Sequence, residues 1–152
     1  MKKLCEKIVK NLTKEKKTIS FMESCTGGYL SNLITNIEGS SKVLKVGLVT
    51  YSNEYKIKFN VPKEIIDKYS VYSSETANEM AKAVSKFAKS DIGVGITGEL
   101  SNNSSNIVYY AFFLKDDNII IEKQIEAKGR TRVAKKKFIA KHILVDILDK
   151  MK

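Results

Sequence analysis

Apolar residues occur along the chain in two patterns, a helical period and short continuous runs. These patterns predict alternating helices and strands. The stretches with a helical period are 2–16, 27–39, 73–90 and the segment from Gly129 to about Met151. Short runs rich in Val, Ile and Phe predict strands at 17–22, 41–52, 91–97, 107–114 and 119–127. A short helix is expected at 63–69, directly after Pro62, the only proline.

Each long helix is expected to bury one apolar face. In the first helix this face consists of Leu4, Cys5, Ile8, Val9 and Leu12. In the helix over 73–90, which a serine caps, it consists of Ala77, Met80, Ala81, Val84, Phe87 and Ala88. In the last helix the inward-facing residues are predicted to be Val133, Phe138, Ile139, His142, Ile143 and Leu148.

The order of these elements predicts an α/β fold. We expect a layered sandwich in which helices flank a mixed β-sheet, with a β-hairpin near the C-terminus followed by a long last helix. The chain shows no internal repeat, linker or low-complexity tract. A single domain over residues 1–152 is therefore predicted.

Composition excludes several classes of protein. Hydrophobic residues make up 43% of the 152 residues, which argues against disorder. No apolar run is long enough for a membrane span, and the first residues do not have the continuous apolar stretch of a signal peptide. Two cysteines do not make a disulfide framework, so a cytoplasmic protein is expected. One histidine and two distant cysteines also make a zinc site or a Ser-His-Asp triad improbable.

The formal net charge is +10, which fits either a lysine-rich solvated surface or attraction to an anion. Only Arg130 and Arg132 among the 27 basic residues are arginines. Reading of base edges relies strongly on arginine, so sequence-specific nucleic-acid binding is poorly supported. A basic nucleic-acid-binding domain remains an alternative that rests on charge alone. The positive field would also attract a small molecule that carries phosphate.

Polar residues with glycine follow three of the predicted strands, and the two arginines lie at the start of the last helix. These residues are Ser24, Thr26, Gly27 and Gly28; Tyr51, Ser52, Asn53 and Lys56; Thr97 and Gly98; and Arg130 and Arg132. Each group alone is compatible with an ordinary turn, polar loop or helix cap. Because ligands bind at strand ends in open α/β sheets, their convergence predicts a site.

Ser24 is the candidate nucleophile, and the glycine turn after it could present backbone amides to an oxyanion. A serine nucleophile needs a base, and a lysine is the substitute when no histidine is available. Free lysine has a pKa near 10.4, so only about one in 2,500 is neutral at pH 7. Burial beside other cations can lower that pKa by about three units, and Lys56 is the best-placed lysine for this role.

The segments "ESCTGG", "GLVTYSNEYK", "YSVYSSETANEMA" and "DIGVGITG" occur in an order and spacing that resemble the CinA C-terminal domain family. This is a family of nicotinamide-nucleotide amidohydrolases, and the resemblance covers roughly residues 4–150. It implies hydrolysis of the carboxamide of nicotinamide mononucleotide to nicotinate mononucleotide and ammonia, without a metal or cofactor. It also implies a homodimer or larger homo-oligomer.

The resemblance also implies roles for single residues. Ser24 would be the nucleophile, and Tyr51 and Lys56 would assist proton transfer. The remaining candidates would line the pocket and hold the oxyanion or the ribose phosphate, with Arg130 helping to bind the phosphate.

Two segments depart from the family pattern. A glycine-rich loop usually follows the "ITG" segment, whereas this chain has the polar loop 99–106, which begins with Glu99. A carboxylate there would repel a phosphate if it faced the pocket. Ala134 stands where a second arginine is expected in the last helix, and Arg132 could compensate for the missing arginine. The alternative is therefore a family member that binds a nucleotide or a partner protein without turnover.

Overall fold

Five strands form one mixed sheet in the order β2-β1-β3-β4-β5. The computed structural model describes residues 1–150, and its strands are β1 (Ile19–Glu23), β2 (Leu44–Val49), β3 (Ile92–Gly98), β4 (Ile107–Leu114) and β5 (Ile119–Glu126). β1 pairs in parallel with β2 and β3, whereas β4 is antiparallel to both β3 and β5. The predicted mixed sheet and C-terminal hairpin are confirmed.

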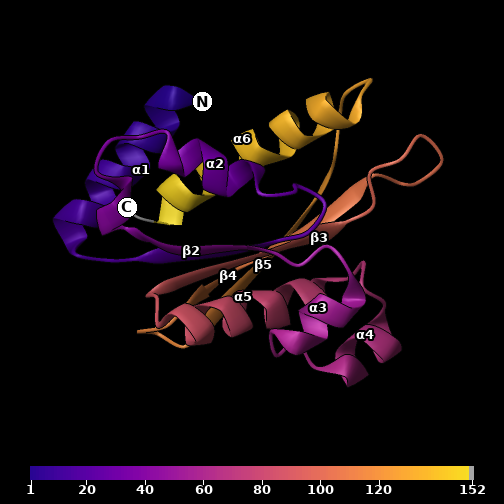
Figure 1. Ribbon diagram of the computed structural model, residues 1–152. Helices are drawn as coiled ribbons and strands as arrows, with labels where there is room; N and C mark the ends of the chain where they lie inside the picture. The colour runs from indigo at the N-terminus through magenta and orange to yellow at the C-terminus, as the bar shows by residue number, and fades with distance from the viewer. Residues whose placement is uncertain (151–152) are drawn as a thin grey trace.

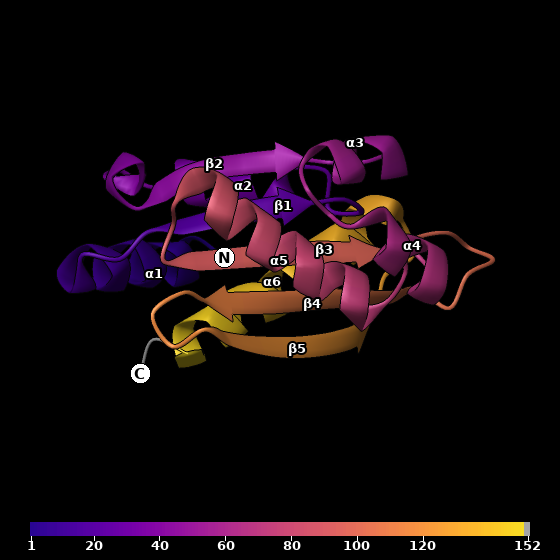
Figure 2. The same ribbon diagram turned by 90° about the horizontal axis from the view of Figure 1, so that it is seen from below.

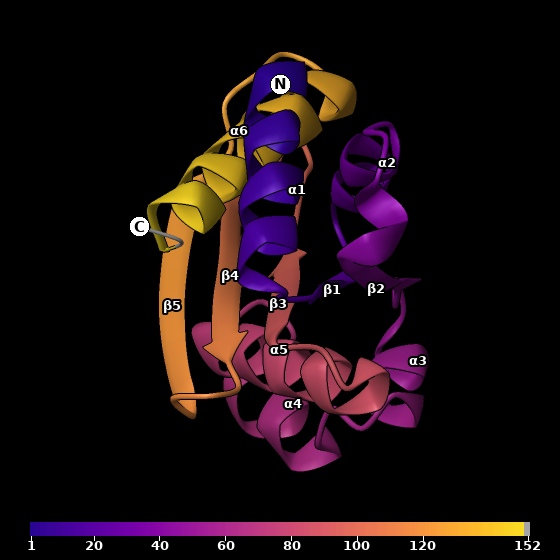
Figure 3. The same cartoon turned by 90° about the vertical axis from the view of Figure 1, so that its left-hand side faces the viewer.

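Helices cover both faces of the sheet, so the molecule has three layers (Figures 1 and 3). One face carries α1 (Lys2–Glu15), α2 (Tyr29–Thr35) and α6 (Arg132–Lys150). The other face carries α3 (Asn53–Lys58), α4 (Lys63–Tyr69) and α5 (Ser74–Ala88). A single 3-10 turn, η1 (Ser40–Lys42), precedes β2. Within the described residues no helix combines the length and the apolar content that crossing a membrane requires.

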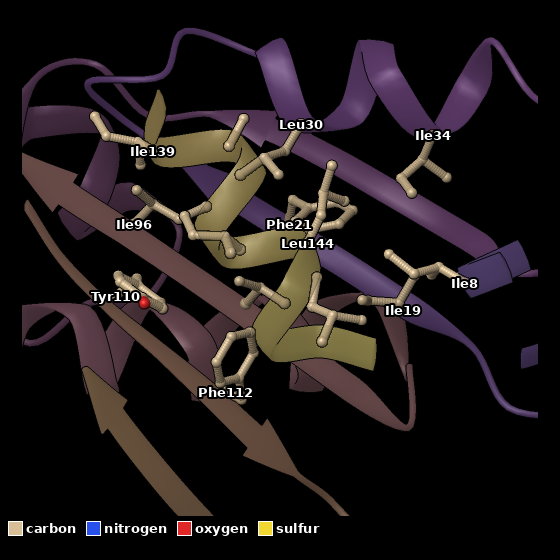
Figure 4. Packing of buried hydrophobic residues seen from close by; sticks show 14 of the residues in the cluster. Ile8, Ile19, Phe21, Leu30, Ile34, Ile96, Tyr110, Phe112, Ile139 and Leu144 are labelled. Atoms are coloured by element: carbon tan, nitrogen blue, oxygen red, sulfur yellow. The ribbon is translucent and has the colours of Figure 1, made fainter. Parts of the chain in front are cut away.

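The main core lies between the sheet and the α1, α2 and α6 layer. Figure 4 shows Phe21 and Ile96 of the sheet packed against Leu30, Ile139 and Leu144 of the helices. All five side chains are fully buried. Burying an apolar side chain of this size stabilises the fold by about 1.5–3 kcal/mol. Apolar side chains from the strands and from one face of each helix therefore form this layer.

The opposite layer depends on the glycines of β3. A Cβ at Gly93 or Gly95 would collide with the carbonyl oxygens of Ala81 and Ala77, which lie on the inner face of α5. The backbone of α5 thus lies directly on β3. This contact sets the distance between α5 and β3, the strand that contains Thr97.

The predicted element boundaries differ from the structure between residues 27 and 58. The helix expected over 27–39 begins only at Tyr29, because Gly28 is left-handed with φ 86°, and ends at Thr35. The strand expected over 41–52 is confined to β2. The short helix α3 was missed; Ser52 caps it by accepting a hydrogen bond from the backbone N–H of Tyr55.

The last helix also presents partly different residues to the core than the sequence predicts. Val133 was expected to face inward but is 62% exposed, whereas Lys135, Ile147 and Leu144 are buried. Near the end of α5, Phe87 was likewise expected on the buried face but is exposed. Both residues lie close to a helix terminus, since Val133 is the second residue of α6 and Phe87 is the last but one of α5.

The carboxyl ends of β1, β2 and β3 meet at one edge of the sheet, close to the start of α6 (Figure 2). From β1 the chain crosses one face through α2 to reach β2, and it returns across the other face through α5 to reach β3. β1 is thus the strand at which the order of the sheet reverses. Open α/β sheets bind ligands at such a point, which directs attention to the residues that follow these strands.

Candidate active site

Ser24 is the first residue after β1 and is held between the two neighbouring strands. Its backbone N–H donates to the carbonyl of Ile96 in β3 over 3.1 Å. On the other side, the N–H of Thr50 donates to the carbonyl of Glu23 over 2.9 Å. The side chain of Ser24 is buried but borders a cavity. The sheet itself therefore fixes the position of this hydroxyl.

Lys56 reaches Ser24 from α3. Its ammonium nitrogen Nζ lies 3.0 Å from Oγ of Ser24 and 2.7 Å from the carbonyl oxygen of Thr50. Lys56 is only 1% exposed and is the one buried residue of α3. No carboxylate lies within ion-pair distance of Nζ among residues 1–150.

Burial without a counter-ion destabilises the charged form of this lysine. It lowers the pKa of Lys56 from its ordinary value of 10.5 to about 8. At pH 7 about one lysine in ten is then neutral, compared with about one in 2,500 for the free side chain. The neutral amine can accept a proton from Oγ of Ser24 across the existing hydrogen bond. Burial alone lowers this pKa, and no neighbouring cation is needed.

The cavity beside this pair has a volume of about 260 Å³. It lies among the ends of β1, β2 and β3 and the start of α6. Its lining residues are Ser24, Cys25, Tyr51, Asn53, Lys56, Val71, Tyr72, Gly98, Glu99, Leu100, Ser101 and Arg132. Six predicted site residues are therefore brought together, namely Ser24, Tyr51, Asn53, Lys56, Gly98 and Arg132.

Arg132 connects two of the walls of this cavity. Its guanidinium donates to the hydroxyl oxygen of Tyr51 over 3.2 Å and also to the carbonyl of Leu100. The loop after β2 is thereby joined to the loop after β3. Tyr51 has no hydrogen bond to Lys56 or Ser24 among the described residues, and its phenol borders the cavity beside them.

Thr26, Gly27 and Gly28 were expected in the pocket but do not line this cavity. They face a separate surface hollow that includes Lys136 of α6. The hydroxyl of Thr26 donates over 2.6 Å to the carboxylate of Glu23, which is completely buried.

The carboxylate of Glu23 fills the position at the start of α2 where a bound anion was expected. It accepts hydrogen bonds from the N–H groups of Leu30 and Ser31 at 3.2 and 2.9 Å, and from the hydroxyl of Ser31 at 2.8 Å. The glycine turn therefore wraps around a side chain of the protein itself. A negative charge at a helix N-terminus is favourable whichever molecule supplies it.

Three other predicted residues also lie outside the cavity. Ser52 caps α3 as described, and the exposed side chain of Arg130 does not reach the cavity. The buried hydroxyl of Thr97 donates to the carbonyl of Val71 over 2.8 Å. Thr97 thus acts indirectly, because it fixes the segment that carries Val71 and Tyr72 into the wall.

The sequence did not predict Val71, Tyr72, Leu100 or Ser101 as site residues. Tyr72 precedes the helix cap at Ser73, and a residue before a cap normally carries no functional signal. Leu100 and Ser101 belong to the loop 99–106, which is docked on α6. Lys135 of α6 donates to the carbonyl of Ser101 over 3.2 Å and to the side-chain oxygen of Asn106 over 2.8 Å.

Cys25 lines the cavity beside Ser24 but also packs into the main core. Burial raises the pKa of this thiol from 9.0 to about 12. The thiolate is the nucleophilic form of cysteine, so a pKa this high makes Cys25 a poor nucleophile at neutral pH. Cys5 is also a buried free thiol.

The chain matches the family model described as the CinA C-terminal domain over residues 1–145. A CinA-like protein of Petrotoga mobilis is 43% identical over 113 residues, which cover 70% of this chain and 28% of that protein. A CinA-like protein of Dictyoglomus thermophilum is 48% identical over 94 residues, covering 61% of this chain and 23% of that protein. The chain thus spans about a quarter of the length of these curated relatives.

Solved structures share the fold. The competence/damage inducible protein CihA of Agrobacterium tumefaciens superposes with a TM-score of 0.91 at 24% identity, covering 99% of this chain and 94% of that chain. A competence-damaged protein (CinA) superfamily member from Klebsiella pneumoniae has a TM-score of 0.90 at 21% identity, covering 98% and 96% of the two chains. With the family model and the relatives above, these matches show that the chain belongs to the CinA C-terminal domain family.

Proposed function

We propose that this protein is an amidohydrolase that releases ammonia from the carboxamide of nicotinamide mononucleotide and forms nicotinate mononucleotide. The observation that carries this proposal is the hydrogen bond between Lys56 Nζ and Ser24 Oγ at the edge of a cavity. The pair supplies an amine close to neutrality and a hydroxyl that this amine can deprotonate. The resemblance in the "ESCTGG" and "YSNEYK" segments supplies the substrate class.

The first half of the reaction forms an acyl-enzyme. Neutral Lys56 accepts the proton of Ser24 while Oγ attacks the carboxamide carbon. The negative charge moves to the carboxamide oxygen, where backbone amides stabilise it. The N–H groups of Ser24 and Gly27 already donate to backbone carbonyls, so the N–H of Cys25, directly after the nucleophile, is the first candidate.

The leaving group departs with a proton from Lys56. The C–N bond breaks, the ammonium of Lys56 protonates the departing nitrogen, and ammonia is released. Lys56 is then neutral again and can accept a proton from water as that water attacks the ester. Expulsion of Oγ of Ser24 with this proton yields the carboxylic acid and the free enzyme.

Ammonia release from nicotinamide mononucleotide tests this proposal, with chromatography to identify nicotinate mononucleotide. We expect turnover by the wild type and a loss of at least about 10³-fold in Ser24→Ala, since the nucleophile is removed. Ser41→Ala is the matched control, because Ser41 is exposed and does not line the cavity. Near-normal turnover by Ser24→Ala would rule out the covalent route.

A second candidate is binding of a nucleotide or partner protein without turnover. The loop 99–106 favours it, because it lacks glycine and places Glu99 in the cavity wall. Under this alternative, nicotinamide mononucleotide would bind to the wild type and to Ser24→Ala with similar affinity, and neither protein would release ammonia. Calorimetric titration combined with the ammonia assay separates the two candidates.

A further inference from the structure

Lys135 is a charged residue on the apolar side of the last helix. Ile139, Ile143 and Ile147 are buried and lie four residues apart along one side of α6. Lys135 precedes Ile139 by four residues and is only 6% exposed, so it occupies the first position of this apolar stripe. Burial of an ammonium is unfavourable unless the group is hydrogen-bonded, and the partners of Lys135 therefore indicate its role.

Lys135 is hydrogen-bonded to both ends of the loop 99–106. Its Nζ donates to the carbonyl of Ser101 over 3.2 Å and to the side-chain oxygen of Asn106 over 2.8 Å. Ser101 lies near the start of the loop, and Asn106 is its last residue. Neither acceptor is a carboxylate. The lysine therefore bridges the two arms of the loop and joins them to α6.

The two arms are also joined to each other within the loop. The backbone of Asn106 is left-handed with φ 55°, and its Nδ2 donates to the carbonyl of Ser104 over 2.9 Å. The carbonyl of Asn106 accepts from the N–H of Ala127 over 2.8 Å. The hydroxyl of Ser104 accepts from the N–H of Ser101 over 3.3 Å. Lys135 connects this network of the loop to the helix.

The first arm of the loop forms part of the cavity wall, because Leu100 and Ser101 line the cavity. The carbonyl of Leu100 accepts a hydrogen bond from Arg132, which also donates to Tyr51. Lys135 lies three residues after Arg132 on α6, and the two side chains hold successive carbonyls of the loop. Arg132 is exposed, whereas Lys135 is buried, so the lysine is the anchor that is shielded from water.

We propose that Lys135 is a positioning residue that holds the loop 99–106 against α6 and thereby keeps the cavity in the shape that binds the substrate. This inference rests on the proposed function, in which the substrate is nicotinamide mononucleotide. Lys135 does not line the cavity and has no hydrogen bond to Ser24 or Lys56 among the described residues. Loss of its contacts should therefore raise KM, whereas kcat stays close to that of the wild type.

Lys135→Met tests this inference, because methionine is apolar and flexible and suits the buried stripe. Hydrogen exchange measured by mass spectrometry should be at least about fivefold faster for the amides of 99–106. Calorimetric titration in the Ser24→Ala background, which prevents turnover, should give a Kd for nicotinamide mononucleotide about fivefold to tenfold higher. With Ser24 present, KM should rise to a similar extent and kcat should stay within about twofold.

Asn106→Gly removes the other side of the contact without changing α6. Glycine adopts the left-handed φ of Asn106 freely, so the backbone is not strained. If Lys135 acts through this contact, the Kd of the double variant should lie within about twofold of that of Lys135→Met. Lys137→Met is the control, since it removes the same charge from an exposed site of the same helix and should change neither the loop exchange nor the Kd.

Loop exchange or affinity that is unchanged in folded Lys135→Met would overturn the inference, and so would a fall in kcat at unchanged KM. If Lys135→Met does not fold, the same measurements on Asn106→Gly decide in its place. Absence of ammonia release by the wild type would count against the proposed function. The exchange of the loop amides would still decide whether Lys135 anchors the loop, so the two ideas can fail separately.

Discussion

Lys56 Nζ lies 3.0 Å from Ser24 Oγ, although the two residues are 32 positions apart in the chain. Ser24 directly follows β1, the central strand of the parallel part of the sheet. Lys56 lies in the six-residue helix α3, which follows the neighbouring strand β2. The lysine is buried without a carboxylate partner, which is unfavourable for the stability of the fold. The contact is therefore better explained by chemistry than by packing.

The cost of this arrangement leads to a prediction about stability. The pKa of Lys56 in the folded protein, about 8, lies below its ordinary value of 10.5, so the unfolded state binds more protons between these pH values. Burial of the ammonium then costs about 3 kcal/mol below pH 8, and the penalty disappears as the pH rises toward 10.5. Lys56→Met removes this penalty.

We therefore expect Lys56→Met to raise the free energy of unfolding by up to about 3 kcal/mol near pH 7 and to abolish turnover. The gain should shrink as the pH is raised from about 8 to about 10.5. Urea unfolding at several pH values measures it, with the exposed neighbour Lys58→Met as the control. A lower stability of Lys56→Met at neutral pH would contradict the account.

Glu23 is expected to be essential for folding rather than for chemistry. Its buried carboxylate accepts four hydrogen bonds, from Thr26, Leu30 and twice from Ser31. Glu23→Ala leaves these donors without a partner, which we expect to cost about 3–5 kcal/mol. The exposed Glu38→Ala should change the free energy of unfolding by less than about 0.5 kcal/mol. Equal stabilities of the two variants would refute this role of Glu23.

Cys25 is predicted to be dispensable for turnover despite its position beside Ser24. With a pKa of about 12, roughly one molecule in 10⁵ carries the thiolate at pH 7. Cys25→Ala should therefore retain the turnover number within about threefold. Folded protein should also resist iodoacetamide, as measured by mass spectrometry. Rapid labelling that parallels a loss of activity would instead make Cys25 a reactive group.

Gly95 is expected to be intolerant of a side chain. Gly95→Ala would push a methyl group into the carbonyl of Ala77, which lies on the backbone of α5. We expect a loss of about 1–3 kcal/mol or more from this overlap. Gly39→Ala is a useful comparison, because its Cβ meets open space and only the left-handed φ of 82° is unfavourable, by about 1–2 kcal/mol. Thermal unfolding should rank Gly95→Ala below Gly39→Ala in stability.

Much of this site could be predicted from the sequence, because strand ends and helix starts meet at one edge of an α/β sheet. Ser24 and Lys56 were identified on that basis, and the structure places them in contact. The helical position of Lys56 was not foreseen, because α3 has only six residues and one buried side chain. Hydrophobic periodicity carries little information over so short a segment.

The glycine turn after Ser24 shows where sequence reasoning reaches its limit. Small residues before a helix fit a bound anion, but they fit a carboxylate of the protein itself equally well. Only the three-dimensional position of Glu23 distinguishes these cases, because it reaches Leu30 and Ser31 at the start of α2. Tyr72 was missed for a similar reason, since Thr97 brings its segment to the cavity through a contact with Val71.

The dependence of ammonia release on pH tests the central claim most directly. If neutral Lys56 is the base, kcat/KM for nicotinamide mononucleotide should rise about tenfold per pH unit and level off near pH 8. Lys56→Ala should lose this rise together with nearly all activity, whereas Lys58→Ala, changed at an exposed lysine of the same helix, should retain both. A wild-type profile that is flat between about pH 6 and 9, or an active Lys56→Ala, would contradict the assignment of Lys56 as the base.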